Sequence, residues 1–149
     1  MQTNPATPQA LDTFTAHYIA AALQLCDEEI GTDATIENLA PEALAKMVAD
    51  CATFQADNAT TLEAAWKYAD EENTNAAGNQ FLGQGSTEYF DGQAGTDFWL
   101  NRNGHGTGYW DRAEIYGEAQ ATALDKAANA FNEADLYLGD NGLVYHSPA

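Results

Sequence analysis

Apolar side chains recur every three or four positions over the first half of the chain, which is the spacing of one face of an α-helix. The pattern begins after Thr7 and Pro8, an N-cap followed by a proline at the first helical position. Pro41 and Glu42 begin a second apolar stripe, with a proline and an acidic residue in its first turn. The spacing therefore predicts that residues 8–72 are mainly helical.

A polar stretch follows at residues 73–96, which are rich in Asn, Gly, Gln, Thr and Ser. This composition is typical of loops, but the stretch is longer than most loops without secondary structure in compact domains. We expect a loop or a loosely ordered excursion here. A short helix near residues 76–83 is one arrangement that would shorten it.

The next segment, residues 97–111, is rich in aromatic side chains. Its centre holds Asn103-Gly104, the dipeptide most typical of a two-residue hairpin turn. Such a turn would place Phe98 opposite Tyr109 as an aromatic pair on two antiparallel strands. The segment is therefore predicted to be a β-hairpin.

The last third of the chain predicts one more helix and one more hairpin. Ala and Leu at helical spacing predict a helix over residues 114–131, and apolar runs around a glycine-rich turn predict a hairpin over residues 135–146. The turn of that hairpin lies at residues 139–142 and holds either two or four residues, which give different registers. The expected fold is one α+β domain, with an antiparallel sheet of about four strands built from two hairpins and three to four helices packed on it.

Charge is the most unusual property of the composition. The chain has 23 acidic and five basic residues, which give a formal net charge of −18. A compact domain of this length is about 38 Å across. It therefore carries roughly one net negative charge per 2 Å, against about one per 1.7 Å along B-DNA. The density is comparable with that of DNA, although acid-rich surfaces also serve solubility alone.

This charge disfavours several partners. The basic residues are too few to neutralise phosphates, so direct binding to nucleic acid or to anionic membranes is disfavoured. No apolar run approaches the ~20 residues that cross a bilayer, and the N-terminus lacks the basic and apolar regions of a signal peptide. The cytoplasm is therefore the expected location, where Cys26 and Cys51 are expected to be buried thiols.

Three segments, residues 40–51, 97–112 and 134–145, together resemble a family of small acidic proteins encoded by tailed bacteriophages. The central segment, DFWLNRNGHGTGYWDR, is the longest and the most unusual of the three. The resemblance implies a phage accessory protein made in the cytoplasm of an infected bacterial host. It implies no established activity and no catalytic residues.

The predicted hairpin at residues 97–111 also holds the best candidate for a site. His105 stands between two glycines at the turn with Arg102 beside it, and Asp97 and Asp111 lie at the far ends of the strands. A histidine oriented by a carboxylate is a general base or a ligand. A neighbouring arginine, however, lowers the pKa of a histidine. An exposed turn histidine or a contact with a partner is therefore favoured over catalysis.

The sequence offers no recognised metal or phosphate site. The three histidines, at positions 17, 105 and 146, are far apart, and the two cysteines lack zinc-type spacing. The acidic turn at residues 139–142 lacks the ladder of a calcium loop, and there is no P-loop or nucleophile elbow. No cofactor is expected, and catalysis is not the favoured function.

The function expected from the charge and the resemblance is inhibition by binding. The partner would be a host protein with a basic nucleic-acid-binding surface, such as a restriction or CRISPR defence system, and DNA mimicry would be the mechanism. Acidic helical faces would occupy that surface, and exposed aromatic side chains would anchor the complex. The residues expected to contact the partner are Glu42, Asp50, Asp57, Glu63, Asp70, Glu71, Glu72, Trp99, Arg102, His105 and Trp110.

Two alternatives come from other classes of protein. One is a small-ligand-binding protein or an enzyme, which would depend on the His105 hairpin. The other is a phage structural or assembly factor that forms homo-oligomers through a neutral aromatic interface. Its acidity would serve solubility only, so its assembly would be insensitive to salt.

Overall fold

The computed structural model describes residues 11–75, 86–104 and 106–148, and the side chains of residues 72–75 and 86 lie outside this description. In this part of the chain there are seven α-helices, two 3₁₀-helices and one pair of strands. In chain order they are α1 (Thr13–Leu25), α2 (Asp27–Ile30), η2 (Ile36–Asn38), α3 (Pro41–Asp57), α4 (Ala59–Asn75), α5 (Ser86–Arg102), η3 (Tyr109–Asp111), α6 (Ala113–Tyr116), α7 (Glu118–Asn129), β1 (Asp135–Leu138) and β2 (Val144–Ser147).

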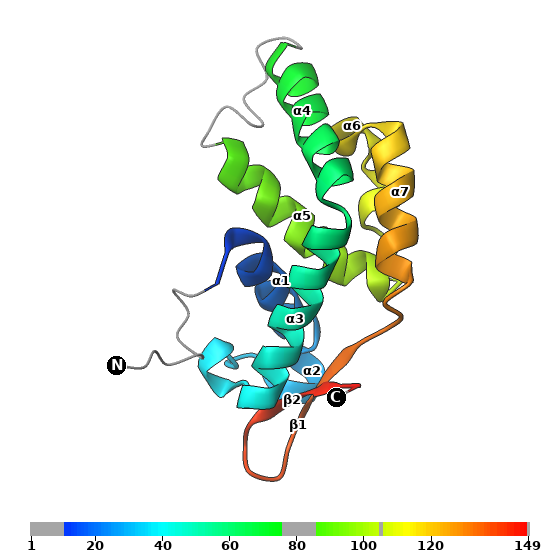
Figure 1. The fold of residues 1–149 in the computed structure, drawn as a ribbon. Helices are drawn as coiled ribbons and strands as arrows, with labels where there is room; N and C mark the ends of the chain where they lie inside the picture. Colours follow the sequence, from blue (N-terminus) through cyan, green and yellow to red (C-terminus); the bar gives the residue numbers. More distant parts are fainter. Residues whose placement is uncertain (1–10, 76–85, 105, 149) are drawn as a thin grey trace, which may run out of the picture.

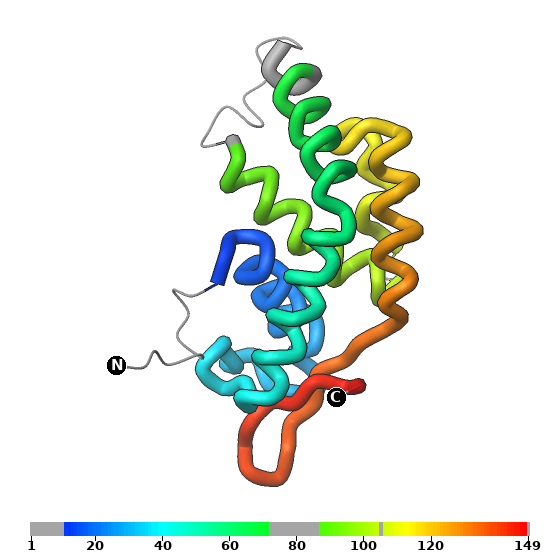
Figure 2. Tube along the Cα trace, in the orientation of Figure 1, coloured from blue at the N-terminus to red at the C-terminus, as the bar shows by residue number. Residues whose placement is uncertain are grey.

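Helices α3 and α4 follow each other end to end along the length of the molecule (Figure 1). The β1–β2 hairpin packs against α3 at one end, and α6 and α7 lie beside α4. In the view of Figure 2, the trace of α5 passes behind the junction of α3 and α4. The elements that are far apart in sequence, α1 and α5, share the most extensive contact among the described elements.

The expected sheet of about four strands with three to four helices is wrong, because the described residues hold seven α-helices and one two-stranded sheet. Residues 97–102 of the first predicted hairpin belong to α5. Helix α5 runs to Arg102, and Phe90, Ala94 and Phe98 lie four positions apart on it with all three side chains buried. Aromatic residues are common in strands because they suit a half-buried surface, and here the buried side of a helix offers them the same burial. The described chain is mainly helical, with one two-stranded antiparallel sheet.

The boundary of the predicted loop at residues 73–96 also changes. Residues 86–96 form the greater part of α5, and residues 73–75 end α4. The short helix considered near residues 76–83 lies outside the described residues. The glycines of this stretch explain the wrong prediction, since glycine in a helix normally weakens it.

Asn103-Gly104 ends α5 and does not form a hairpin turn. Gly104 has a φ of 64°, and its N–H donates to the carbonyl oxygen of Asn101 at 3.3 Å. The left-handed conformation that glycine provides in a hairpin turn also terminates helices, so the dipeptide is ambiguous by itself. The Asn103 side chain accepts a hydrogen bond from the N–H of Ala134 at 2.7 Å, which ties this helix end to the chain before β1.

The second predicted hairpin is present. Strands β1 and β2 are antiparallel, with Leu138 opposite Val144. The N–H of Gly139 donates to the Leu143 carbonyl at 2.8 Å, and Gly142 has a φ of 84°. The turn therefore holds three residues, neither two nor four, and its last residue is the glycine that this kind of turn requires.

The other helices begin or break at identifiable residues. Helix α1 begins at Thr13, where the Asp12 side chain accepts a hydrogen bond from the Thr15 N–H at 2.8 Å, and the predicted start at Pro8 is therefore wrong. The helix predicted over residues 114–131 occurs as α6 and α7. Gly117, with a φ of 88°, separates them, because the left-handed conformation interrupts a helix.

Aromatic rings fill the centre of the core around Phe98. Its ring centroid lies 4.2 Å from that of Phe54 and 5.0 Å from that of Tyr18. Phe14 and Phe131 lie at 6.0 and 5.1 Å. Aromatic pairs in such arrangements each contribute about 0.5–1.5 kcal/mol beyond the burial of their area. Phe98 thus joins α1, α3, α5 and the chain after α7.

Helix α5 approaches α1 closely because Gly95 lacks a side chain. A Cβ at this position would overlap the backbone carbonyl oxygen of Phe14. At Gly92, one turn earlier, a Cβ would meet only the end of the His17 side chain, at 2.8 Å from Nε2, and His17 is exposed. The two glycines therefore differ in what a methyl group would displace.

We expect Gly95→Ala to destabilise the protein by at least about 1–3 kcal/mol, because the two helix backbones must move apart. Gly92→Ala is the matched control, and it should be neutral or stabilising by up to about 1 kcal/mol, since alanine favours the helix and His17 can rotate away. Urea unfolding followed by circular dichroism measures both. Equal effects of the two substitutions would contradict the α1–α5 packing.

Candidate functional site

Three of the residues expected to contact a partner lie in the interior. Trp99 is 1% exposed, Arg102 is 4% exposed and Asp50 is 6% exposed. Trp99 and Arg102 were placed on an exposed hairpin by the sequence, but both belong to the buried side of α5. Asp50 lies between Met47 and Phe54 on the buried stripe of α3. These three residues are therefore removed from the candidate surface.

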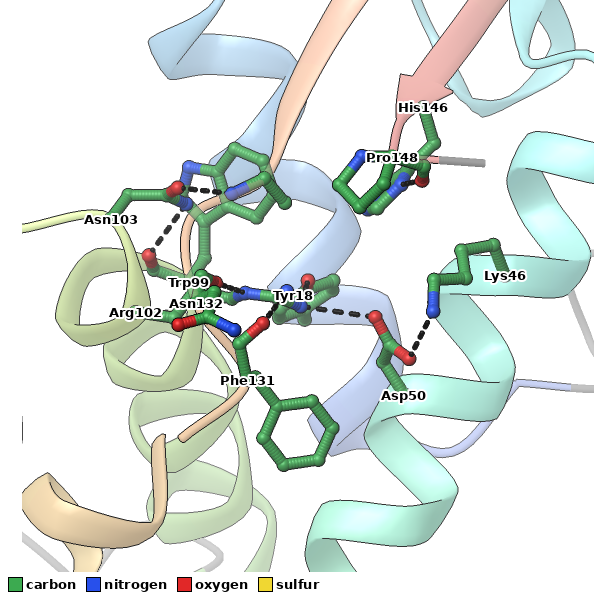
Figure 3. Close-up of polar contacts among 11 residues, drawn as sticks. Tyr18, Lys46, Asp50, Trp99, Arg102, Asn103, Phe131, Asn132, His146 and Pro148 are labelled. Carbon is green, nitrogen blue, oxygen red and sulfur yellow. Dashed lines mark hydrogen bonds and ion pairs between the residues drawn. The ribbon is translucent and has the colours of Figure 1, made fainter. Parts of the chain in front are cut away.

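The Arg102 guanidinium is the centre of a buried polar cluster (Figure 3). Its Nη1 donates to the Tyr18 hydroxyl and to Asp50 Oδ2, both at 3.0 Å. Its Nε donates to the Asn132 carbonyl at 2.8 Å, and Nη2 donates to the Phe131 carbonyl at 2.9 Å. Arg102 thus connects α5 to α1, to α3 and to the chain between α7 and β1.

Further contacts stabilise the charges of this cluster. Lys46 Nζ lies 3.1 Å from Asp50 Oδ1, so the carboxylate has a cation on each oxygen (Figure 3). The guanidinium carbon lies 5.7 Å from the ring centroid of Phe98 and 5.4 Å from that of Phe131, within the range of cation–π attraction. Burial raises the pKa of Tyr18, so its hydroxyl stays neutral and can accept the arginine hydrogen bond.

A second buried carboxylate, Asp97, joins α5 to the η3–α6 segment. It accepts hydrogen bonds from the Tyr116 hydroxyl at 2.6 Å, from Arg112 Nε at 3.0 Å and from Gln93 Nε2 at 3.1 Å. Burial raises the pKa of Asp97, and these donors oppose the increase. Carboxylates with shifted pKa values are common at active sites. Asp97, however, is 0% exposed, so it is inaccessible to a substrate.

The His105 hypothesis loses its structural basis. Residues 97–102 are helical, and His105 itself lies outside the described residues. The two carboxylates expected to orient it are bound elsewhere: Asp97 as above, and Asp111 by the N–H of Gly108 at 2.9 Å. A general base oriented by either carboxylate is therefore not supported.

The acidic residues predicted on α3 and α4 do lie mainly on the surface. Asp70 is half-buried, the Glu72 side chain lies outside the described residues, and those exposed are Glu42, Asp57, Glu63 and Glu71. Spacings of seven and eight residues place Glu63, Asp70 and Glu71 on one side of α4. With a rise of 1.5 Å per residue, the end-to-end helices separate Glu42 from Glu71 by roughly 40 Å.

Interior ion pairs take up part of the scarce positive charge. Arg102 and Arg112 pair at 3.0 Å with Asp50 and Asp97, the two buried carboxylates among the described residues. Without these two pairs, 21 of the 23 acidic residues and three of the five basic residues remain. The ratio of acidic to basic residues is therefore higher in the rest of the protein than in the sequence as a whole.

Trp110 is the predicted aromatic contact that remains exposed. It lies in η3 between buried Tyr109 and exposed Asp111, and 54% of its surface is accessible. Tryptophan is enriched among the residues that dominate binding energy at interfaces. An exposed tryptophan beside an acidic residue suits a surface that binds a basic partner.

Two pockets of about 500 Å³ each are lined in part by residues of the α1–α2 segment. The first is mainly apolar, and its lining includes Leu11, Ile19, Leu23, Ala34 and Ile36. The second is more polar, and its lining includes Cys26, Glu29, Trp99 and Asp135. The sequence did not predict this second group, because Cys26 and Asp135 lie 109 positions apart and only the fold brings them together.

No protein-family model matches the chain, and neither a curated protein nor a solved structure matches it. No helix in the described ranges is both long enough and apolar enough to cross a membrane. The function is therefore argued from the charges and the geometry of this chain.

We expect Arg102→Met to destabilise the protein by about 3–5 kcal/mol, because it leaves Asp50, Tyr18 and two carbonyl groups without their buried donor. Arg102→Lys should restore only part of this loss, since an ammonium group lacks the planar fork. The control is Lys67→Met, which removes an exposed pair with Glu63 and should cost at most about 0.5 kcal/mol. Denaturant unfolding measures all three, and an Arg102→Met effect as small as the control would contradict the assigned role.

Proposed function

We propose that the protein is an acidic inhibitor that binds a host protein and occupies its basic nucleic-acid-binding surface. The observation that carries this proposal is the charge imbalance: besides the pairs of Arg102 with Asp50 and of Arg112 with Asp97, the sequence has 21 acidic residues and three lysines. Such a field attracts a basic groove over long distances and speeds association. It also disfavours direct binding to nucleic acid, because phosphates would be repelled.

The cellular setting of this proposal comes from the resemblance to small acidic phage proteins. That resemblance supports expression in the cytoplasm of an infected bacterium, where a defence system or another nucleic-acid-binding machine would be the target. Inhibitors of the anti-restriction and anti-CRISPR type are the corresponding functional class. Binding, and not catalysis, is the proposed mechanism, since the His105 hairpin on which the enzymatic alternative depended is absent from the fold.

The proposed contact surface is the acidic side of α3 and α4. Its length of roughly 40 Å corresponds to about 12 base pairs of B-DNA at 3.4 Å each. The described acidic residues on this surface are fewer than the phosphates of such a duplex. Lys67, whose Nζ lies 3.7 Å from Glu63 Oε2, offsets part of their negative charge. We therefore assign long-range attraction to the whole charged surface and assign specificity to this side of the helices together with the Trp110 anchor.

Capture from a bacterial lysate with the tagged protein is the first test. We expect recovery of one nucleic-acid-handling protein or complex that is released by high salt and by competing DNA, since screening and phosphate competition both weaken charge attraction. Retention that resists both treatments, or recovery of the protein itself alone, would contradict DNA mimicry.

The captured partner then allows a test of the α3–α4 surface. The variant Glu42→Gln/Asp57→Asn/Asp70→Asn/Glu71→Gln removes four charges from it, and we expect a fall in association rate of at least about tenfold at low salt. The matched control, Glu37→Gln/Glu88→Gln/Glu114→Gln/Asp140→Asn, removes four charges elsewhere and should have a smaller effect. Equal losses in the two variants would show that net charge, and not this surface, directs binding.

A separate prediction concerns Trp110. Replacing an exposed aromatic anchor with alanine should weaken binding to the captured partner by roughly 30-fold or more, about 2 kcal/mol, with little change in stability. Tyr137→Ala, which alters another exposed aromatic residue on β1, is the control. Calorimetric titration of each variant with the captured partner measures the two affinities. An affinity of Trp110→Ala equal to that of the unaltered protein would remove Trp110 from the interface.

A further inference from the structure

Three possible metal ligands converge beside the polar pocket. Cys26 lies at the junction of α1 and α2, Glu29 follows three positions later on α2, and Asp135 is the first residue of β1. One turn of helix places Cys26 and Glu29 on the same side, and β1 packs against α2. The sulfur and one oxygen from each carboxylate all lie within 4.8 Å of one another.

The distance between two of these atoms already matches a coordination shell. Zn²⁺ binds sulfur at about 2.3 Å and carboxylate oxygen at about 2.0 Å, so a tetrahedral angle separates the two ligands by about 3.5 Å. Cys26 Sγ lies 3.5 Å from Asp135 Oδ1, to which it donates a hydrogen bond. A metal ion would take the place of the thiol proton between these atoms.

The surroundings of the cluster provide supporting contacts. The N–H of Leu136 donates to Asp135 Oδ1 at 2.9 Å. A backbone donor of this kind orients a carboxylate ligand. Burial raises the pKa of the Cys26 thiol to about 11, so a metal ion would have to displace its proton. Trp99 lines the same pocket, and its Nε1–H is buried without a hydrogen-bond partner among the described residues.

We propose that Cys26, Glu29 and Asp135 form a three-ligand site for Zn²⁺. One thiolate with two carboxylates is a mixed donor set that suits this borderline-soft ion better than Mg²⁺ or Ca²⁺, which prefer oxygen ligands alone. Binding forms a sulfur–zinc bond and releases the thiol proton to solvent. The fourth position faces the pocket and is filled by water or by an acceptor group of another molecule.

The site links α2 to β1, so zinc should stabilise the fold as well as bind to it. A ligand that binds only the native state shifts the unfolding equilibrium towards that state. Because Cys26 must lose its proton, zinc affinity should increase with pH. This proposal is independent of the partner-binding function, and its tests need no partner.

Titration of the full chain after EDTA treatment and dialysis tests the site. We expect one Zn²⁺ per chain by calorimetry and a thiolate-to-metal charge-transfer band with Co²⁺. Cys26→Ser should abolish the band and lower zinc affinity by roughly 100-fold or more, and Asp135→Asn should lower it by at least about tenfold. The controls are Cys51→Ala, which changes the other thiol, and Asp140→Asn, which changes another exposed acid, and both should keep one-to-one binding.

A second measurement uses only the unaltered protein, so it tests the site even if the variants fail to fold. In the unaltered protein, Zn²⁺ should slow alkylation of Cys26 at least tenfold and leave Cys51 unaffected, as read by mass spectrometry. Absence of both the cobalt band and this protection would overturn the proposal. Weak binding of many ions that survives Cys26→Ser would overturn it as well, because the acidic surface alone would then explain the binding.

Discussion

The fold depends on one buried cation. Arg102 ends α5 inside the protein, and four of its five N–H groups donate to α1, to α3 and to two carbonyls of the chain after α7. The desolvation free energy of an unpaired guanidinium in the same place would be prohibitive. The four partners must therefore assemble together, and this requirement fixes how α1, α3, α5 and the chain between α7 and β1 meet. Hydrophobic packing around Phe98 supplies stability, while Arg102 selects one arrangement of those helices.

Part of the fold follows directly from local sequence patterns. The β1–β2 hairpin and most of α3, α4 and α7 were predicted, because their apolar spacing and turn glycines act over a few residues. Helix α5 was not predicted, since its aromatic residues and its two glycines, Gly92 and Gly95, resemble a strand and a loop when read locally. Only packing against α1 explains why Gly95 is favourable there. Tertiary contact overrides the local preference in this helix.

The candidate sites also divide into features that were predictable from the sequence and features that were not. The acidic surface was predictable from composition, and so was the exposure of most acids on α3 and α4. Asp50, however, lies three positions after Met47 in an apolar stripe, and that position was a sequence signal that this acid is buried and needs a cation. No comparable signal joined Cys26 to Asp135, because residues so distant in the chain meet only after the fold is complete.

The contact between α1 and α5 has a consequence for biosynthesis. The N-terminal helix ends at Leu25, and the helix on which it packs most extensively ends at Arg102, 77 positions later. At about 5–20 residues per second, a ribosome takes roughly 4–15 s to synthesise the intervening chain. During that time α1 has the short α2 and then α3 as neighbours but lacks its main partner, and its apolar face is open to chaperones. Helix α1 is thus synthesised well before the helix that buries most of its apolar face.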